Sequence, residues 1–331
     1  MHPFVPTLET IAFRPEPPEP AALASAARRA GDALAAEPPD RRSPDAEGRP
    51  GGLLRLDPDL PTVIVPDLHA RLDFLFSLLT RSLAGEAPVL EQLAAGELQV
   101  LCLGDGMHAE ARAAARWEKA LREFSGGFRR HAAMDEEMRE SLGLMELVME
   151  LKAAFPERFH FLKGNHENIA NEEGGGNHPF AKFALEGELV TDYMRRFYGE
   201  EVLDAHYRFE KELPLLAVGR GFLASHAEPA RPFQPEEVVA YRERSDVVYG
   251  LTWTANGRAA AGSVERMLEH YLGCPQTCYY FGGHRPVRGL YRLTGRYVQL
   301  HDPERWVIAR VPAAGEIELD RDILDIGEVV E

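Results

Sequence analysis

Residues 158–167 of the chain read RFHFLKGNHE, an apolar run that ends in an amide, an imidazole and a carboxylate. The aromatic and apolar residues over 158–162 predict a short buried strand. Burying Asn165, His166 and Glu167 in succession behind such a strand is costly unless the three side chains have partners. The stretch therefore predicts a strand that delivers polar side chains to a functional site.

Four further apolar runs have the same character, and each leads into side chains that bind metals. The predicted strands are PTVIV at 61–65, LQVLCL at 98–103, GFLA at 221–224 and CYYF at 278–281. The polar side chains that follow them are Asp67 and His69, Asp105, His226, and His284. Apolar residues at helical spacing lie between the runs, so the alternation indicates an α/β fold. Ligands of such folds gather at the carboxyl ends of strands, and we expect these side chains to converge there.

Carboxylate, imidazole and amide side chains form a ligand set that suits divalent ions such as Mn, Fe or Zn. A carboxylate can bridge two ions about 3.5–4 Å apart, which is the separation used in two-metal phosphoryl chemistry. Each motif alone is weak evidence, since an isolated His226 would more often be a core histidine. Together, the five strand ends favour a metal centre over coincidence.

The order of these motifs resembles the calcineurin-like metallophosphoesterase superfamily, whose signature runs DxH, GDxxD, GNH[DE], H and GH. KGNHE, SHAEP and GGHRPV are most similar to the serine/threonine-protein-phosphatase type and its bacterial relatives. The resemblance covers residues 60–302 and implies a four-layer α/β/β/α sandwich of two mixed sheets, with two divalent ions at the edge between the sheets. The implied ligands are Asp67, His69 and Asp105 for one ion, and Asp105 as the bridge with Asn165, His226 and His284 for the other.

The resemblance also implies a mechanism for phosphate-ester hydrolysis. A hydroxide between the two ions would attack phosphorus in line. His166 would protonate the leaving oxygen as the general acid, with Glu167 or His108 fixing its tautomer. Asp105 would serve catalysis as the bridging ligand.

The second motif departs from the family, because GDxxDRG is replaced by GDGMHAE at 104–110. His108 stands where relatives have the Asp that orients the catalytic histidine, and Ala109 stands where they have a phosphate-binding Arg. A neutral His108 could accept the hydrogen bond, or Glu110 could replace the missing carboxylate. The substrate contacts are then assigned to Arg285, Arg258 and Asn165.

The last motif departs as well. Pro286 occupies the position of the second His in the GHxH variant of the family. His301 is a reserve candidate for that ligand, although a histidine at a strand end without a metal is the simpler interpretation.

The remaining chain predicts the domain organisation. Residues 1–55 are expected to form a linker-like N-terminal extension, because Pro, Ala, Arg and Glu dominate it. Residues 56–315 would form the metallophosphoesterase domain, with 106–157 as a helical insertion that either decorates the fold or caps the metal centre. Alternation over 289–311 predicts a C-terminal antiparallel hairpin or meander, and 316–331 would be an acidic tail.

Composition limits the partners. The net charge of −16 argues against binding to a nucleic-acid duplex or an anionic membrane. No run approaches the roughly 20 apolar residues that cross a bilayer, and no signal-like segment precedes the domain, so a cytoplasmic location is expected. Three cysteines cannot form a disulfide framework, and the CxxxC pair Cys274 and Cys278 is a weak zinc signal. The expected partner is a phosphorylated protein or small molecule, and the oligomeric state stays open.

Two alternatives remain beside a phosphoprotein phosphatase. The first is a dinucleoside-polyphosphate or nucleotide phosphohydrolase with the same chemistry. The second is a metal-binding scaffold that recognises phosphate with little activity, because the Asp–Arg pair of the second motif is lost.

Overall fold

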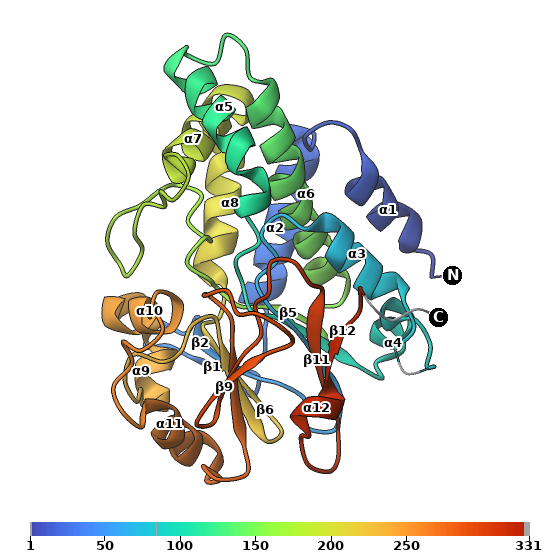
Figure 1. The fold of residues 1–331 in the computed structure, drawn as a ribbon, viewed down its shortest axis with the longest axis vertical. Coiled ribbons are helices and arrows are strands. Elements are labelled where there is room, and N and C mark those ends of the chain that lie inside the picture. The colour runs from blue at the N-terminus through green and yellow to red at the C-terminus, as the bar shows by residue number, and fades with distance from the viewer. Residues whose placement is uncertain (1, 84, 328–331) are drawn as a thin grey trace.

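The computed structural model describes residues 2–83 and 85–327, and within these ranges the chain forms two mixed sheets flanked by helices (Figure 1). One sheet has the strand order β12-β11-β3-β4-β5. Its strands are β3 (Thr62–Val65), β4 (Gln99–Cys102), β5 (Phe159–Phe161), β11 (Val307–Val311) and β12 (Ile323–Asp325). β3, β4 and β5 run parallel, so their carboxyl ends lie at one edge, while β11 pairs antiparallel with both β3 and β12.

The other sheet has the order β1-β2-β6-β7-β8-β10-β9. Its strands are β1 (Arg42–Pro44), β2 (Pro50–Arg55), β6 (Leu216–Gly219), β7 (Phe222–Ser225), β8 (Tyr279–Gly282), β9 (Arg292–Thr294) and β10 (Tyr297–Gln299). β7, β8 and β10 are parallel neighbours, and β9 and β10 form an antiparallel hairpin. The hairpin that we expected near the C-terminus is therefore present, but β11 leaves it and joins the first sheet.

The helices cover the outer faces of the sheets. They are α1 (Val5–Phe13), α2 (Pro20–Ala35), α3 (Leu72–Thr80), α4 (Val89–Ala95), α5 (Ala114–Ser125), α6 (Ala132–Ala154), α7 (Glu186–Tyr193), α8 (Glu200–Glu212), α9 (Pro235–Val239), α10 (Ser245–Thr252), α11 (Ser263–Leu272) and α12 (Leu319–Asp322). Short 3-10 turns, η1 (Ala111–Ala113) and η3 (Tyr241–Glu243), and a π-helical turn, η2 (Met194–Tyr198), complete the set. No helix among the described residues is long and apolar enough to span a bilayer.

The period of two along each strand divides the core into three apolar layers. Ile64 and Leu101 point between the sheets, where they join Phe281 in one cluster. Val63 and Val65, the neighbours of Ile64, belong instead to the cluster beneath the helices of the first sheet. A third cluster lies under α9, α10 and α11. The expected four-layer α/β/β/α sandwich is thereby confirmed.

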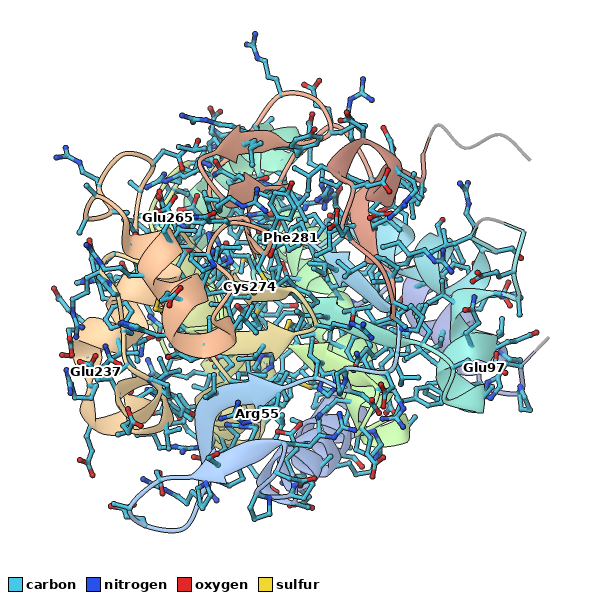
Figure 2. The ribbon with its side chains drawn as sticks, turned by 90° about the horizontal axis from the view of Figure 1, so that it is seen from below. Arg55, Glu97, Glu237, Glu265, Cys274 and Phe281 are labelled. Carbon is cyan, nitrogen blue, oxygen red and sulfur yellow. A yellow bond between two sulfur atoms is a disulfide. The ribbon has the colours of Figure 1, made fainter. Side chains whose placement is uncertain are left out.

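Figure 2 shows the two helical layers on opposite sides of the molecule, with Glu265 on α11 at one side and Glu97, just beyond α4, at the other. Cys274 lies just past the end of α11 and forms a disulfide with Cys278, at the entry to β8. The pair is therefore bonded to itself rather than arranged as two thiols for zinc. Cys102 is free and buried in β4, as expected of a core residue.

Residues 1–55 differ from the linker-like extension that we expected. They contain α1, α2, β1 and β2, and β2 pairs with β6 inside the second sheet. The Ala-rich α2 buries Leu23, Ala26, Ala27 and Ala30 against α6 and α8, because this spacing places small side chains on one helical face. The high alanine content thus reflects close helix packing rather than disorder.

Buried ionic contacts fasten this N-terminal part to the fold. The Arg42 guanidinium donates to Glu37 at 3.0 Å and to the Gly51 carbonyl at 2.7 Å, and Lys152 of α6 also contacts Glu37. Gly52 is required in β2, since a Cβ there would lie 2.5 Å from the Val238 carbonyl oxygen of α9.

The other flanking segments are also packed. The expected insertion over 106–157 is helical, consisting mainly of α5 and α6, and α6 is buried along most of its length against α2 and α1. Within the expected tail over 316–331, α12 and β12 complete the edge of the first sheet beside β11. Residues 328–331 of that tail lie outside the described residues.

Candidate metal centre

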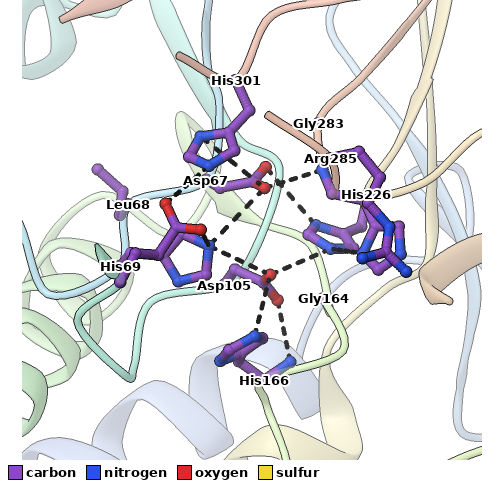
Figure 3. Close-up of polar contacts among 12 residues, drawn as sticks. Asp67, Leu68, His69, Asp105, Gly164, His166, His226, Gly283, Arg285 and His301 are labelled. Carbon is purple, nitrogen blue, oxygen red and sulfur yellow. Dashed lines mark hydrogen bonds and ion pairs between the residues drawn. The ribbon is translucent and has the colours of Figure 1, made fainter. Parts of the chain in front are cut away.

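The carboxyl ends of β3, β4, β5, β7 and β8 meet at the edge between the two sheets. Figure 3 shows the side chains that they bring together. Asp67, Asp105 and His226 are at most 1% exposed, so the cluster lies beneath the surface. The convergence that we predicted from the strand ends is therefore observed in the fold.

One part of the cluster surrounds Asp67. Its carboxylate Oδ2 lies 4.0 Å from His69 Nε2 and 4.0 Å from His301 Nδ1, and it accepts a hydrogen bond from the His284 backbone amide at 2.8 Å. Asp105 Oδ2 lies 3.7 Å from the same His69 nitrogen. Carboxylate and imidazole atoms from three strand ends thus face one point.

The other part contacts the same Asp105 oxygen, Oδ2, and contains His226, Asn165 and His284. His226 Nε2 lies 3.2 Å from Asp105 Oδ2 and 3.0 Å from Asn165 Oδ1. The same Asn165 oxygen lies 2.8 Å from His284 Nδ1. Asp105 therefore stands between the two groups, where a bridging carboxylate would be.

The hydrogen bonds of the imidazoles fix which nitrogen faces the cluster. His69 donates from Nδ1 to the His108 carbonyl at 3.1 Å, and His226 donates from Nδ1 to the Leu103 carbonyl at 3.0 Å. In its neutral form, each ring therefore presents the lone pair of Nε2 to the carboxylates. Metal-bound histidines show this pattern, in which a backbone carbonyl or carboxylate holds the second nitrogen.

These residues fit divalent ions as ligands. Three groups of His and carboxylate side chains have ligand atoms within 4.8 Å of one another, and two of the groups share Asp105. Zinc-like ions hold nitrogen and oxygen at about 2.0–2.2 Å, so two ligands of one ion lie no more than about 4.4 Å apart. Within the described part of the chain, Asp67 Oδ1 and His301 Nδ1 are buried without a hydrogen-bond partner. Such atoms are costly unless a cation binds them.

Backbone strain accompanies the ligands. His69, Asp105 and His284 have φ angles of 43°, 53° and 64°, in the left-handed region that ordinary residues avoid. A Cβ on Gly283 would lie 1.8 Å from Asp67 Oδ1, so only glycine fits beside that carboxylate. Strain of this kind is retained at functional sites.

The electrostatics favour positive charge between the carboxylates. Burial raises the pKa of Asp105, but His226 and His166 outweigh burial and hold that pKa well below its usual range. Burial lowers the pKa of His226, but Asp105 and Asp67 outweigh it and raise the value to about 9. A divalent ion would supply the same positive charge at this point.

His166 and His108 form a direct pair. Their Nδ1 atoms lie 2.8 Å apart, so one ring donates to the other. Burial and the nearby His69 lower the pKa of His108 to about 3, which makes it a neutral partner. Of the two residues expected to orient His166, His108 is therefore the one that contacts it in the structure.

Glu167 has a different role from the one that we expected. Its two oxygens accept hydrogen bonds from the backbone amides of Gly164, Asp105 and Gly106 at 2.6–2.9 Å, rather than from the His166 ring. Burial and the neighbouring Asp105 raise its pKa to about 7. Glu167 therefore ties the turn after β4 to the turn after β5 and so sets the position of Asp105.

The two arginines proposed for substrate lie at the surface of the site. Arg285 directly follows His284, and its charge contributes to lowering the pKa of that imidazole, after burial and His226. Arg285 and Arg258 are both exposed. Their guanidinium groups therefore stand in solvent rather than against the buried carboxylates.

Other side chains at the site were not identified from the sequence. Phe180, from the loop between β5 and α7, lies 3.8 Å from the His166 ring centre and stacks on His108. Arg112 lies beside a cavity of about 320 Å³ that reaches His69 and Glu110. Arg112 donates to the Ala70 carbonyl at 3.1 Å. The sequence offered one indication of Arg112, because it lies three residues after Ala109, the position where the resemblance implies an arginine.

Comparisons with known proteins give the fold. No family model and no curated relative matches the sequence. A protein serine/threonine phosphatase from Saccharomyces cerevisiae is 14% identical, with a TM-score of 0.55 and coverage of 93% of this chain and 89% of that one. A cold-active protein-tyrosine phosphatase from a Shewanella species is 14% identical, with a TM-score of 0.40 and coverage of 80% and 83%. A candidate diadenosine tetraphosphatase is 14% identical, with a TM-score of 0.40 and coverage of 83% and 97%. The chain has the fold of the Saccharomyces cerevisiae protein serine/threonine phosphatase.

Proposed function

We propose that this chain hydrolyses phosphate esters with two divalent metal ions. The observation that carries the proposal is the convergence of five strand ends on Asp105, with the His69 and His226 tautomers fixed so that each presents a free nitrogen. One ion would be held by Asp67, His69 and Asp105, and the other by Asp105 with Asn165, His226 and His284. When bound, the ions would act as Lewis acids on the phosphoryl group and lower the pKa of coordinated water toward about 7.

His166 is proposed as the general acid. Its Nε2 faces the cluster, 3.8 Å from Asp105 Oδ2, while its Nδ1 is held by His108. If His108 accepts the hydrogen bond, His166 keeps a proton on Nδ1 and gives its Nε2 proton to the leaving oxygen. Phe180 packs on both rings and is proposed to shield this proton-transfer path from water.

The negative protein charge requires local attraction for a phosphate group. The formal charge of −16 repels an anionic substrate at long range, so the ions must provide the attraction at short range. Arg285 and Arg258 are proposed to meet the parts of the substrate that remain outside the buried centre, and Asn165 to meet the phosphoryl group.

Metal analysis of protein reconstituted with Mn²⁺ tests the proposal. We expect two equivalents of metal and turnover of p-nitrophenyl phosphate. Asp105→Asn should lose both, because the bridging charge is removed, whereas Asp204→Asn on the exposed face of α8 should retain both. Less than one equivalent in folded wild-type protein would refute the metal centre, and equal turnover in Asp105→Asn would refute its role in hydrolysis.

The general acid and the substrate class are tested separately. His166→Asn should lower kcat by about 10²–10⁴-fold while metal content stays at two equivalents. A panel of phosphopeptide, nucleotide and bis-p-nitrophenyl phosphate distinguishes a phosphoprotein phosphatase from a nucleotide phosphohydrolase. Turnover that depends on Asp105 would also reject a phosphate-recognition scaffold without activity.

A further inference from the structure

His301 is a buried histidine whose ring faces the metal cluster from a strand that the family signature does not use. It follows β10 by two residues and is fully buried. Its Nδ1 lies 4.0 Å from Asp67 Oδ2, and its ring centre lies 5.3 Å from that of His69 (Figure 3). Within the described residues this nitrogen has no hydrogen-bond partner.

Glu110 determines the tautomer of His301. The Glu110 Oε2 atom lies 2.9 Å from His301 Nε2, and its Oε1 atom lies 3.5 Å from Lys182 Nζ. An ionised carboxylate only accepts hydrogen bonds, so the proton of the neutral His301 ring must be on Nε2. The lone pair is then on Nδ1 and points toward Asp67.

The same arrangement holds the ring of His69. There a backbone carbonyl takes the N–H and the other nitrogen faces Asp67 Oδ2, at the same 4.0 Å that separates His301 from that oxygen. Atoms that share one ion at about 2.0–2.2 Å can be separated by up to about 4.4 Å, so each imidazole nitrogen is spaced from Asp67 Oδ2 as a second ligand of the same ion would be. The three ligand atoms lie within 4.8 Å of one another.

We infer that His301 Nδ1 is a fourth protein ligand of the ion held by Asp67, His69 and Asp105, and that Glu110 positions it. The inference rests on the proposed metal centre. With it, each ion has four protein ligands, since Asp105, Asn165, His226 and His284 surround the other. Pro286 removes the second His of the GHxH pattern, and His301 supplies an imidazole from a different strand.

An ordinary core histidine is the competing interpretation. A core ring would bury the unpaired Nδ1 beside the Asp67 carboxylate, which is unfavourable without a partner. It would also give no reason for Glu110, a carboxylate with little exposed surface, to face its Nε2 atom. A ligand role accounts for both nitrogens of the ring.

The experiment is a metal titration of apo protein with Mn²⁺ followed by competition with a chelator. We expect two ions in the wild type. His301→Ala should lower the affinity for one ion by 10-fold or more and leave the affinity for the second ion unchanged. His284→Ala should lower the affinity for the second ion. Glu110→Ala should lower the affinity for the same ion as His301→Ala does, by about 10–100-fold, because loss of a carboxylate that holds a ligand histidine typically costs this much affinity. His270→Ala, at an exposed position on α11, is the matched control and should change neither affinity.

Coordination is measured directly with Co²⁺. Its visible absorption should change in His301→Ala and Glu110→Ala but not in His270→Ala. The inference would be overturned if the wild type binds two ions and a folded His301→Ala or Glu110→Ala protein binds both with unchanged affinity. The proposed function would then remain intact. If His301→Ala does not fold, His301→Leu decides, because Glu110→Ala also removes a carboxylate oxygen that lies 3.7 Å from His69 Nε2. A folded wild type that binds no ion would overturn both.

Discussion

At the scale of single residues, the His108–His166 pair sets the acidity of the proposed general acid. A neutral His108 stabilises a protonated His166 less than a carboxylate would. Burial already holds the pKa of His166 well below its usual range. The proton of the proposed general acid is therefore held more weakly than it would be beside a carboxylate.

His108→Asp should move the alkaline limb of the pH–rate profile to higher pH. An anion beside His166 raises the pKa of the imidazolium, so the acid form persists as pH increases. Asp also tolerates the φ of 63° at this position. Initial rates on p-nitrophenyl phosphate from pH 5 to 9 measure the shift, with His270→Asp as the control. An unchanged or lower alkaline limb would show that His108 does not act on His166.

His226 makes metal binding dependent on pH. Its pKa in the metal-free protein is raised to about 9 by Asp105 and Asp67 against the effect of burial, yet it must be neutral to bind a metal. Affinity should therefore increase as pH rises toward 9, by up to about tenfold per pH unit for one competing proton. Calorimetry in two buffers of different ionisation enthalpy should detect about one released proton at pH 7. Binding without proton release would contradict this assignment.

The convergence of the proposed ligands was predictable where they directly follow an apolar run, as Asp67 and Asp105 do. His301 also follows a strand, but no motif separates a ligand from an ordinary buried histidine there. The exchange of Asp for His108 was visible in the sequence, whereas its contact with His166 was not. Phe180 reaches the site from an irregular loop, and composition gives no signal for such a contact.

At the scale of elements, α2 is part of the core rather than an appendage. Leu23→Ala should lower the free energy of unfolding by about 2–5 kcal/mol, because the side chain is fully buried among α2, α6 and α8. Urea unfolding measures the change. Arg28→Ala, on the exposed face of the same helix, should cost about 1 kcal/mol or less. If both substitutions lowered the free energy of unfolding by equally small amounts, α2 would contribute little to the stability of the core, as expected of a linker.

The strands β3, β4, β5, β7 and β8 were predictable because each is a continuous buried apolar run. β2 was missed because Pro50, Gly51 and Gly52 indicate a turn, although the glycines are there to admit α9 against the strand. α2 was noticed but placed in a linker, since alanine gives little hydrophobic signal. Both β2 and α2 are stabilised by contacts with elements far along the chain, β6 and α9 for β2, and α6 and α8 for α2.

At the scale of the whole molecule, bound ions should stabilise the fold, because both sheets supply their ligands. Removal of metal with a chelator should lower the Tm by several degrees. An ion that binds only the folded state contributes about 2.7 kcal/mol when its free concentration is 100 times its Kd. Differential scanning calorimetry of wild type and Asp105→Asn measures this effect. If the chelator lowered the Tm of both proteins equally, the stabilisation would not come from ions bound at Asp105.

The spread of the ligands along the chain has a consequence for biosynthesis. The proposed donors extend from residue 67 to residue 301, and β11 and β12, which complete the first sheet, follow them in the sequence. A nascent chain that ends before His226 therefore lacks three of the seven proposed ligands, His226, His284 and His301. The proposed metal centre can be complete only after residue 301 has been synthesised, so we expect metal loading to follow the folding of both sheets.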